Sequence, residues 1–411
     1  MKVKTNSKFF EKNIAKFVFC SFFPTGLEDY VNFFKEKFDN FVYIKFKFPH
    51  SRDPKAYSVI QIYSHGKLKN TKRLFSFSLV NRKLFYFLFL PINYLIYFLE
   101  AIFSLNFFPS NEKKGKVVFM GINYFCAFCG IILKRLGKVD FVIYRVMDFF
   151  PLPASGPYRL LNRIFYILDE FCLRNADSIW FTTEGHIIGR EKYGYFDRGK
   201  YHYQMIPLGL DIEKFFSSPL KERKQNSLVY CGVVSKYYLL DLIFEALKDL
   251  GKEFNELRFH IIGSGPDLDY YKDLACKKGL EDVVFFHGFM EESREFRNIM
   301  ESSLLGIALY KDEENFIKYT EPAKVKYYLS FGVPSIVSKV PEIAKELDRR
   351  KVCFAVNNNE SEITRKISEY FSNRAMQVKY INNINNFVKE IDIRELLERT
   401  LIKTFNYEKN N

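Results

Sequence analysis

The chain has 411 residues, 48% hydrophobic and 27% charged, which predicts two well-packed domains of about 200 residues each and excludes a disordered or fibrous protein. The formal net charge of +14 is uneven. Residues 1–210 carry 31 basic and 16 acidic side chains, whereas residues 211–411 carry 31 and 32. The first half therefore suits an anionic membrane or an anionic substrate, the alternative being an ordinary basic surface.

The cysteines and the start of the chain indicate a reducing compartment. Seven Cys is an odd number, and the apolar run 17–23 is too short for the core of a secretory signal, so we expect a cytoplasmic protein. Cys126 and Cys129 form a lone CxxC in apolar surroundings. We interpret them as two buried small hydrophobic residues, with a metal or redox pair as the alternative.

The first half alternates short apolar runs with amphipathic segments. The pattern predicts strands over 17–22, 41–46, 117–120, 141–144, 178–181 and 204–207, and helices over 28–38, 126–136 and 158–175. The most apolar region, 84–108, has three interpretations: a buried core helix beginning at Pro91, an interfacial membrane patch flanked by basic residues, or a membrane span. Pro91, Asn93 and Glu100 disfavour the span.

The second half shows the same alternation more clearly. It predicts strands over 227–231, 257–262, 283–287, 304–310, 334–337 and 352–355, and helices over 239–250, 267–278, 291–302, 321–331, 341–347 and 361–372. This order is typical of a parallel sheet with helices on both faces. Ligands of such sheets lie beyond the carboxyl ends of the strands.

The polar stretch 319–324 opens the helix over 321–331. Pro322 suits a first helical position, and the free N–H groups of a helix start favour phosphate. Glu321 and Lys324 flank that place, which indicates a sugar nucleotide. Gly232, Gly263 and Gly265 follow strands and allow close approach of a ligand, or they are ordinary turn glycines.

In order along the chain, five segments resemble the donor domain of GT-B glycosyltransferases of the glycogen-synthase-like, group 1 type, family 4 and its relatives. They are 206–211 with Phe215, 230–232, 261–266, 284–289, and Pro322-Ala323-Lys324 with Tyr328-Leu329 and Gly332-Val333-Pro334. In the first half, Pro24-Thr25-Gly26 resembles the acceptor-side glycine loop, and 175–179 resembles a strand entry of this family. The resemblance covers nearly the whole chain but is thin over residues 45–115.

The resemblance implies two Rossmann-like doubly wound domains facing across a cleft. The acceptor-binding domain would span 1–208 and the nucleotide-sugar-binding domain 209–375, with a helical tail, 376–411, packing back on the first. It also implies transfer of a sugar from a nucleotide-sugar to a glycan or lipid-linked glycan, in cell-envelope polysaccharide or lipopolysaccharide synthesis, on the inner face of the membrane.

The departures from the family pattern concern charged residues. Where many relatives carry Arg and Lys after the first donor-domain glycine, this chain has Val233 and Tyr238, so Lys236 is the substitute contact for the diphosphate. The paired Glu of an E-x7-E spacing would fall at Tyr319 and Tyr327 and is missing. Retention of configuration, the habit of the family, is therefore not assumed.

We assign candidate roles as follows. Lys324 neutralises charge on the leaving diphosphate, Glu321 accepts hydrogen bonds from ribose or sugar hydroxyls, and Asp148 is the base that takes the acceptor proton. Each also has a plain structural alternative, as a surface lysine, a helix-start acid and a turn cap. The donor-binding candidates are Gly232, Lys236, Gly263, Gly265, His287, Gly288, Tyr319, Thr320, Pro322 and Ala323; the acceptor-side candidates are Thr25, Gly26 and Arg145.

No Asp-x-Asp is placed to hold a divalent metal, so neither a metal nor another cofactor is expected. His65 and His186 are expected to be structural. Three other functions remain open: a nucleotide-sugar epimerase of the same architecture, a non-catalytic subunit, and a nucleic-acid binder suggested only by charge.

Overall fold

The computed structural model describes residues 13–22, 27–47, 57–74, 92, 95–102, 115–151, 157–215 and 226–410. The chain divides into two units. Unit 1 comprises Met1–Thr182, Gly189–Ile206 and Leu397–Asn411, and unit 2 comprises Thr183–Ile188 and Pro207–Leu396. The chain thus changes unit between Ile206 and Pro207, two residues before the expected boundary. Of the expected tail, 376–396 belongs to unit 2 and 397–411 to unit 1.

Unit 1 is built on an eight-stranded sheet of order β4-β3-β2-β1-β5-β6-β7-β8. Its strands are β1 Ile14–Phe22, β2 Asn40–Phe46, β3 Val59–Ser64, β4 Lys67–Arg73, β5 Lys116–Ile122, β6 Phe141–Val146, β7 Ser178–Phe181 and β8 Tyr203–Met205. The β2–β3 and β3–β4 pairs are antiparallel and the others parallel. Strands β2 and β5 both follow β1 in the chain but lie on opposite sides of it in the sheet, which makes the carboxyl ends of β1 and β5 the switch point.

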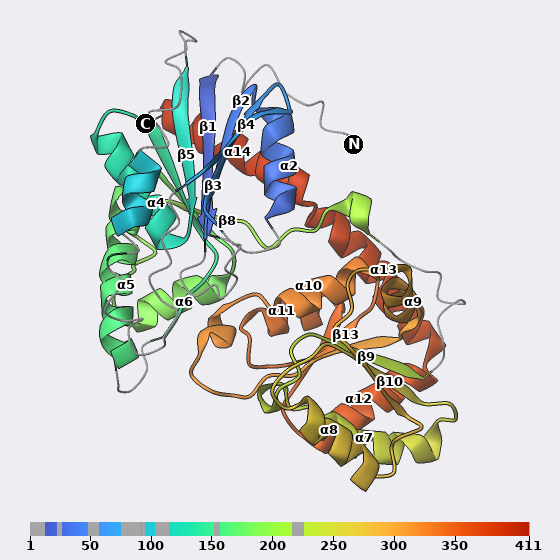
Figure 1. The fold of residues 1–411 in the computed structure, drawn as a ribbon. Helices are drawn as coiled ribbons and strands as arrows, with labels where there is room; N and C mark the ends of the chain where they lie inside the picture. The colour runs from blue at the N-terminus through green and yellow to red at the C-terminus, as the bar shows by residue number, and fades with distance from the viewer. Residues whose placement is uncertain are drawn as a thin grey trace. The chain divides into compact units, whose positions relative to one another are not determined.

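Helices cover both faces of this sheet. Figure 1 shows α4 and α5 on one side and α2 and α14 on the other. They are α2 Glu28–Lys37, α4 Asn123–Arg135, α5 Pro157–Asn175 and α14 Ile393–Asn410, with α6 Glu184–Lys192 following β7. Phenylalanines fill the space between helix and sheet; Phe17 of β1, for example, stacks on Phe38 with ring centroids 4.3 Å apart. The high Phe content thus serves the core of unit 1.

Unit 2 has a six-stranded parallel sheet of order β11-β10-β9-β12-β13-β14. The strands are β9 Ser227–Cys231, β10 Arg258–Ile262, β11 Val284–Gly288, β12 Leu305–Ala308, β13 Ser335–Ser338 and β14 Cys353–Val356. Numbered from β9, this order is 3-2-1-4-5-6, the doubly wound Rossmann arrangement. Its switch point lies between β9 and β12, so the loops after these strands are where a ligand is expected.

The helices of unit 2 also form two layers. Figure 1 shows α10 and α11 on one side of the sheet and α7, α8 and α12 on the other. They are α7 Leu240–Glu253, α8 Leu268–Lys277, α9 Arg294–Ser302, α10 Ala323–Ser330, α11 Ile343–Arg349, α12 Glu360–Ser372 and α13 Arg374–Glu390. The α/β fold class with two Rossmann-like units is therefore confirmed.

The apolar region 84–108 is described only at residue 92 and over 95–102, where it is helical. Tyr97, Glu100 and Ala101 are buried in unit 1, whereas Leu95 and Leu99 are exposed. Burial raises the pKa of Glu100 to about 8. Among the described residues, no helix is both long enough and apolar enough to cross a membrane.

Candidate active site

Glycine turns bring three strand ends of unit 2 together. Gly232 and Gly263 have φ of 144° and 140°, and Gly288 has φ of 67°. The Gly232 N–H donates to Ile262 O at 2.9 Å, and the Gly263 N–H donates to Gly288 O at 2.7 Å. A Cβ on Gly263 would lie 1.8 Å from Gly232 O, and one on Gly265 would lie 2.2 Å from Val234 O. Gly263 and Gly265 are needed because the loops pack backbone to backbone at these two positions.

Lys324 lies in the first turn of α10, beside these loops. Its Nζ donates to the Tyr230 hydroxyl at 2.7 Å, and it lies 3.2 Å from the centroid of the Tyr238 ring. The rings of Tyr230 and Tyr310 have centroids 4.3 and 5.9 Å away. A Cβ on Gly232 would lie 2.6 Å from Lys324 Cε, so that glycine makes room for the lysine. The amine is thus held in an aromatic cage formed by Tyr230, Tyr238 and Tyr310.

The cage changes the charge state of the amine. Burial lowers the pKa of Lys324 to about 7, and the Cys231 thiol opposes this shift. Burial raises the pKa of Tyr230, Tyr238 and Tyr310, so their hydroxyls stay neutral. Within the described part of the chain, no carboxylate forms an ion pair with Lys324. A bound anion would therefore stabilise the protonated form of this amine and raise its pKa.

The expected role of Glu321 is not supported. This residue is 4% exposed, and its Oε1 lies 2.8 Å from Lys326 Nζ, which is also buried. Its Oε2 accepts a hydrogen bond from the Leu208 N–H at 2.7 Å. One carboxylate oxygen forms an ion pair and the other accepts a hydrogen bond, both within unit 2. Glu321 therefore fixes the segment at Leu208 instead of facing a sugar.

The remaining donor-binding candidates differ in accessibility. The Lys236 amine lies 3.8 Å from the centroid of the Tyr270 ring and is exposed. His287 Nε2 lies 3.0 Å from His260 Nδ1, and burial lowers the pKa of His287 while Glu295 opposes that shift. Around the start of α10, two predicted residues are buried and two are accessible to solvent. Tyr319 and Pro322 are the buried pair, and Thr320 and Ala323 are the accessible pair.

In unit 1, Asp148 lies where a base was expected. It follows β6 at the carboxyl edge of the sheet and is half-buried. Its Oδ2 accepts a hydrogen bond from Asn123 Nδ2 at 2.8 Å. Burial raises the pKa of Asp148, while the hydrogen bond from Asn123 and the charge of Arg190 lower it. A carboxylate whose pKa is raised, and which accepts a hydrogen bond from an amide, is suited to act as a general base.

Arg145 requires a correction. It is fully buried, and its guanidinium donates to Ile206 O at 2.8 Å, Tyr30 Oη at 3.2 Å and Trp180 O at 3.4 Å. These bonds tie β6 to the segments around it, so Arg145 is structural and does not hold an acceptor phosphate. Thr25 and Gly26 lie outside the described residues.

The cysteine and histidine predictions can also be placed. Cys126 and Cys129 are buried in unit 1, as the structural interpretation requires, and His186 is buried as well. His65 lies in the β3–β4 turn, and its Nδ1 is 2.9 Å from Asp39 Oδ1. No group of three or more His, Cys, Asp or Glu side chains within the described ranges is arranged to hold a metal ion.

Several residues of the two sites were not predicted from the sequence. They are the cage residues Tyr230, Tyr238 and Tyr310, the ion-pair partner Lys326, and Asn123 with Arg190 beside Asp148. Tyr238 could have been identified from the sequence as a site residue, because it occupies the position at which many relatives have a lysine. The others come from elements distant in the chain, and no local pattern marks them.

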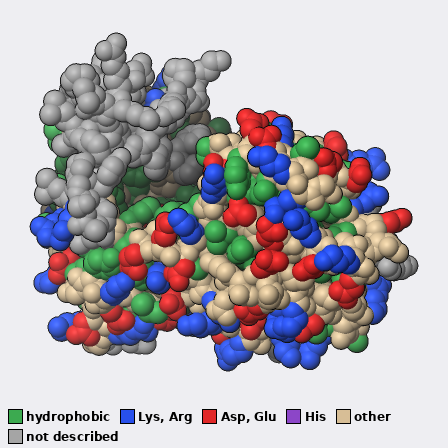
Figure 2. Space-filling view, turned by 90° about the horizontal axis from the view of Figure 1, so that it is seen from below, with side chains coloured by type: hydrophobic (Ala, Val, Ile, Leu, Met, Phe, Trp, Pro, Cys, Tyr) green, Lys and Arg blue, Asp and Glu red, His purple; other side chains and the backbone are tan. Residues whose placement is uncertain are grey.

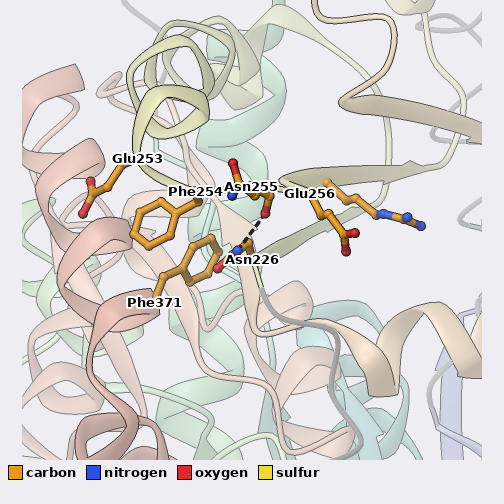
Figure 3. A pocket seen from close by; sticks show the side chains of 7 residues that line it. Asn226, Glu253, Phe254, Asn255, Glu256 and Phe371 are labelled. Carbon is orange, nitrogen blue, oxygen red and sulfur yellow. Dashed lines mark hydrogen bonds between the residues drawn. The ribbon is translucent and has the colours of Figure 1, made fainter.

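A groove of about 740 Å³ lies elsewhere on unit 2. Figure 3 shows the rings of Phe254 and Phe371 lining it, with Glu253 and Glu256 at its sides. It also contacts Asn226 and Arg258, which stand at the starts of β9 and β10. The groove is thus at the amino ends of the strands, away from Lys324, and is not the candidate site.

Comparison with known proteins agrees with this geometry. Residues 211–387 match the family model described as "Glycosyl transferases group 1". The chain resembles the structure of Anabaena Alr3699/HepE in complex with UDP, at 12% identity and TM-score 0.64, covering 96% of this chain and 100% of that one.

It also resembles sucrose-phosphate synthase from Thermosynechococcus elongatus, at 13% identity and TM-score 0.66, over 96% and 99% of the two chains. A third similar structure is described as trehalose-6-phosphate from E. coli bound with UDP-2-fluoro glucose, at 13% identity, TM-score 0.63, and 95% and 99% coverage. The chain matches none of the curated protein sequences. Residues 211–387 thus match the group 1 glycosyltransferase family model, and the chain has the two-domain GT-B fold of these similar structures.

Proposed function

We propose that the protein moves a sugar from a nucleotide-sugar donor to a glycan or lipid-linked glycan acceptor. The observation that carries this proposal is the amine of Lys324 at the start of α10, which has no carboxylate partner among the described residues. It lies beside the glycine turns at the switch point of the unit 2 sheet. A diphosphate bound there would meet a cation and free helix N–H groups. The UDP and UDP-sugar complexes of similar structures support a nucleotide-sugar donor.

In this proposal the two units supply different parts of the reaction. Lys324 stabilises negative charge on the leaving diphosphate, and Asp148 accepts the proton of the attacking hydroxyl, as an inverting transfer requires. Because the lysine provides the charge, we propose that the reaction needs no divalent metal. Turnover measured before and after treatment with EDTA tests this, and a loss that Mg²⁺ or Mn²⁺ restores would contradict it.

We further propose that the acceptor is presented at the inner face of an anionic membrane during cell-envelope polysaccharide or lipopolysaccharide synthesis. The support is the excess of 15 positive charges in residues 1–210. Co-sedimentation with vesicles of phosphatidylglycerol, compared with neutral phosphatidylcholine vesicles, tests this. Equal binding to both would contradict it, because a charge-driven association depends on anionic lipid.

The donor proposal is tested by thermal unfolding in the presence of UDP-, GDP-, ADP- and CMP-sugars. A bound donor raises the melting temperature, because it binds the folded state alone. We expect one base to be preferred and the shift to disappear in Lys324→Met. Lys272→Met, which removes an exposed lysine of α8, is the control and should keep the shift.

One observation favours a second function. Because Glu321 forms a buried ion pair with Lys326, its carboxylate is not available to a bound donor. A non-catalytic subunit of this fold would tolerate that loss. Donor binding without turnover on any tested acceptor would support that function. Conversion of the donor alone into an isomeric nucleotide-sugar would instead identify an epimerase.

A further inference from the structure

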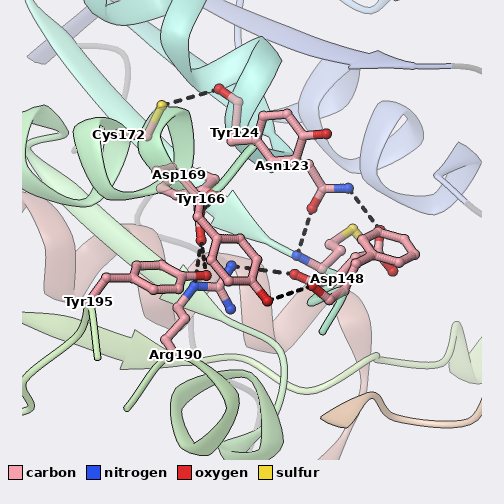
Figure 4. Close-up of polar contacts among 11 residues, drawn as sticks. Asn123, Tyr124, Asp148, Tyr166, Asp169, Cys172, Arg190 and Tyr195 are labelled. Carbon is pink, nitrogen blue, oxygen red and sulfur yellow. Dashed lines mark hydrogen bonds and ion pairs between the residues drawn. The ribbon is translucent and has the colours of Figure 1, made fainter. Parts of the chain in front are cut away.

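Asn123 occupies an unusual backbone position at the carboxyl edge of unit 1. It is the first residue of α4, directly after β5, and its φ is 61°. Residues other than glycine rarely adopt this left-handed conformation, and asparagine is among those that tolerate it best. The conformation turns the side chain toward the end of β6, where Asp148 lies, as Figure 4 shows.

The amide of Asn123 makes two contacts that fix its orientation. Nδ2 donates to Asp148 Oδ2 at 2.8 Å, and Oδ1 accepts from the Met147 N–H at 3.0 Å. Turning the amide over would face its oxygen toward the carboxylate and its NH2 toward a backbone N–H, and both contacts would be lost. The side chain is therefore set to donate to Asp148, which suits the ionised form of that carboxyl.

Arg190 of α6 approaches Asp148 from another direction. Its Nη2 lies 3.4 Å from the Asp148 backbone oxygen, and its Nε donates to Asp169 Oδ2 at 2.8 Å. Asp169 also accepts hydrogen bonds from the hydroxyls of Tyr144 and Tyr195. Asp169 and Arg190 are both buried, so the guanidinium has a fixed place beside Asp148, as Figure 4 shows.

We propose that Asn123 is a positioning residue that orients the carboxylate of Asp148 and keeps it ionised for proton acceptance. The proposal rests on the proposed function in so far as Asp148 acts as a base; the hold of Asn123 on Asp148 does not depend on it. Burial raises the pKa of Asp148, and the Asn123 amide and the charge of Arg190 are the groups that oppose this shift. Among the described residues, removing the amide leaves the charge of Arg190 to oppose it.

Two variants separate positioning from folding. Asn123→Gly removes the amide and suits the left-handed φ, so the fold should be retained. Asn123→Asp keeps the shape and the acceptor for the Met147 N–H but places a second carboxylate against Asp148. Asn226→Gly is the matched control, because Asn226 also has a positive φ, of 60°, and belongs to unit 2, whereas Asp148 belongs to unit 1.

The first readout is the pKa of Asp148, followed by carbon NMR of protein labelled at aspartate and assigned by comparison with Asp148→Asn. We expect a rise of about one unit in Asn123→Gly and a larger rise in Asn123→Asp. Asn226→Gly should leave it unchanged. The acid limb of the pH profile of kcat/KM should move by the same amount as the pKa.

The outcomes distinguish the inference from the proposed function. An unchanged Asp148 pKa in both Asn123 variants, with their folds intact, overturns the inference. A shifted pKa without a matching shift of the acid limb supports the hold of Asn123 but removes Asp148 as the base. If no donor is turned over, the NMR titration still decides whether Asn123 controls Asp148.

Discussion

At the scale of single residues, the caged amine of Lys324 links ligand binding to protons. Its pKa of about 7 means that most of the amine is neutral at pH 8, whereas a bound diphosphate stabilises the charged form. We predict that, when UDP or the preferred nucleoside diphosphate binds at pH 8, the Lys324 amine takes up close to one proton. Calorimetry in buffers of different ionisation enthalpy measures this uptake. Affinity should fall as pH rises from 7 to 9.

Arginine provides the control for this prediction. Lys324→Arg stays charged at every pH in this range, so binding to that variant should take up no proton through this side chain. Equal proton uptake in the wild type and in Lys324→Arg would show that the proton goes elsewhere.

The buried pair of Glu321 and Lys326 predicts a stability effect. Glu321→Gln still accepts from the Leu208 N–H but leaves the Lys326 charge uncompensated, so we expect a loss of about 3 kcal/mol of unfolding free energy. The double variant Glu321→Gln/Lys326→Met should recover much of that loss. Urea denaturation of the single and double variants measures both.

A surface pair sets the scale for comparison. Asp249 and Lys252 are 2.7 Å apart and exposed, and Asp249→Asn should change stability by less than about 1 kcal/mol. If Glu321→Gln has as small an effect while abolishing donor binding, the carboxylate faces the donor after all.

These residues show what the sequence reveals and what it hides. The position of Lys324 beside the glycine turns follows from its place after β12, because the carboxyl ends of parallel strands share one edge. The role of Glu321 could not be predicted, since one partner is a backbone N–H at Leu208, 113 residues away. The aromatic cage is equally hidden, because its three tyrosines come from three separate segments.

At the scale of elements, the packing of loops predicts which glycines can be replaced. Gly263→Ala would place a Cβ 1.8 Å from Gly232 O at a φ of 140°. We expect it to lower the melting temperature of unit 2 and to weaken donor binding. Gly251, within α7, has nothing within 4 Å of its Cβ position. Gly251→Ala should raise stability by about 0.5–1 kcal/mol, because alanine favours a helix.

Circular dichroism melting curves of the two alanine variants check this pair. A harmless Gly263→Ala would mean that the loops after β9 and β10 can separate, and that Gly263 is present for another reason.

The sequence predicts the strands and helices of unit 2 closely; β9 runs over 227–231 in both the prediction and the structure. In unit 1 the hairpin of β3 and β4 was not predicted. Its turn residues, His65 and Gly66, have positive φ of 46° and 75°. Histidine is not a usual hairpin-turn residue, so the turn carried no sequence signal. Most of β4 is exposed, so its sequence does not alternate between hydrophobic and polar residues. Helix α6 was missed as well.

At the scale of the whole molecule, the last residues of the chain stabilise unit 1. Glu398 pairs with Lys37 at 2.6 Å, and Thr404 Oγ1 accepts from Gln204 Nε2 at 2.6 Å and from Trp180 Nε1 at 3.2 Å. We predict that removing residues 397–411 lowers the unfolding temperature of unit 1 and leaves that of unit 2 nearly unchanged. Differential scanning calorimetry should resolve the two transitions. A uniform shift of both would contradict this division.

Charge is also distributed over the molecule in a way that bears on partners. On the face shown in Figure 2, basic and acidic side chains are interspersed among polar and hydrophobic ones. The excess of positive charge lies in residues 1–210, whereas residues 211–411 are nearly balanced. The sequence therefore predicted the charge asymmetry and the two Rossmann-like units, but not the point within 376–411 at which the chain leaves unit 2.

A short parallel bridge joins the beginning and the end of the long segment of unit 2. Leu210 N donates to Ile391 O and Ile393 N donates to Leu210 O, each at 2.9 Å. Because its two ends already touch, the segment 207–396 has the topology of a cassette inserted into unit 1. Because unit 2 also includes Thr183–Ile188, a chimera that exchanged only this segment would keep that short piece of unit 2 from the host chain.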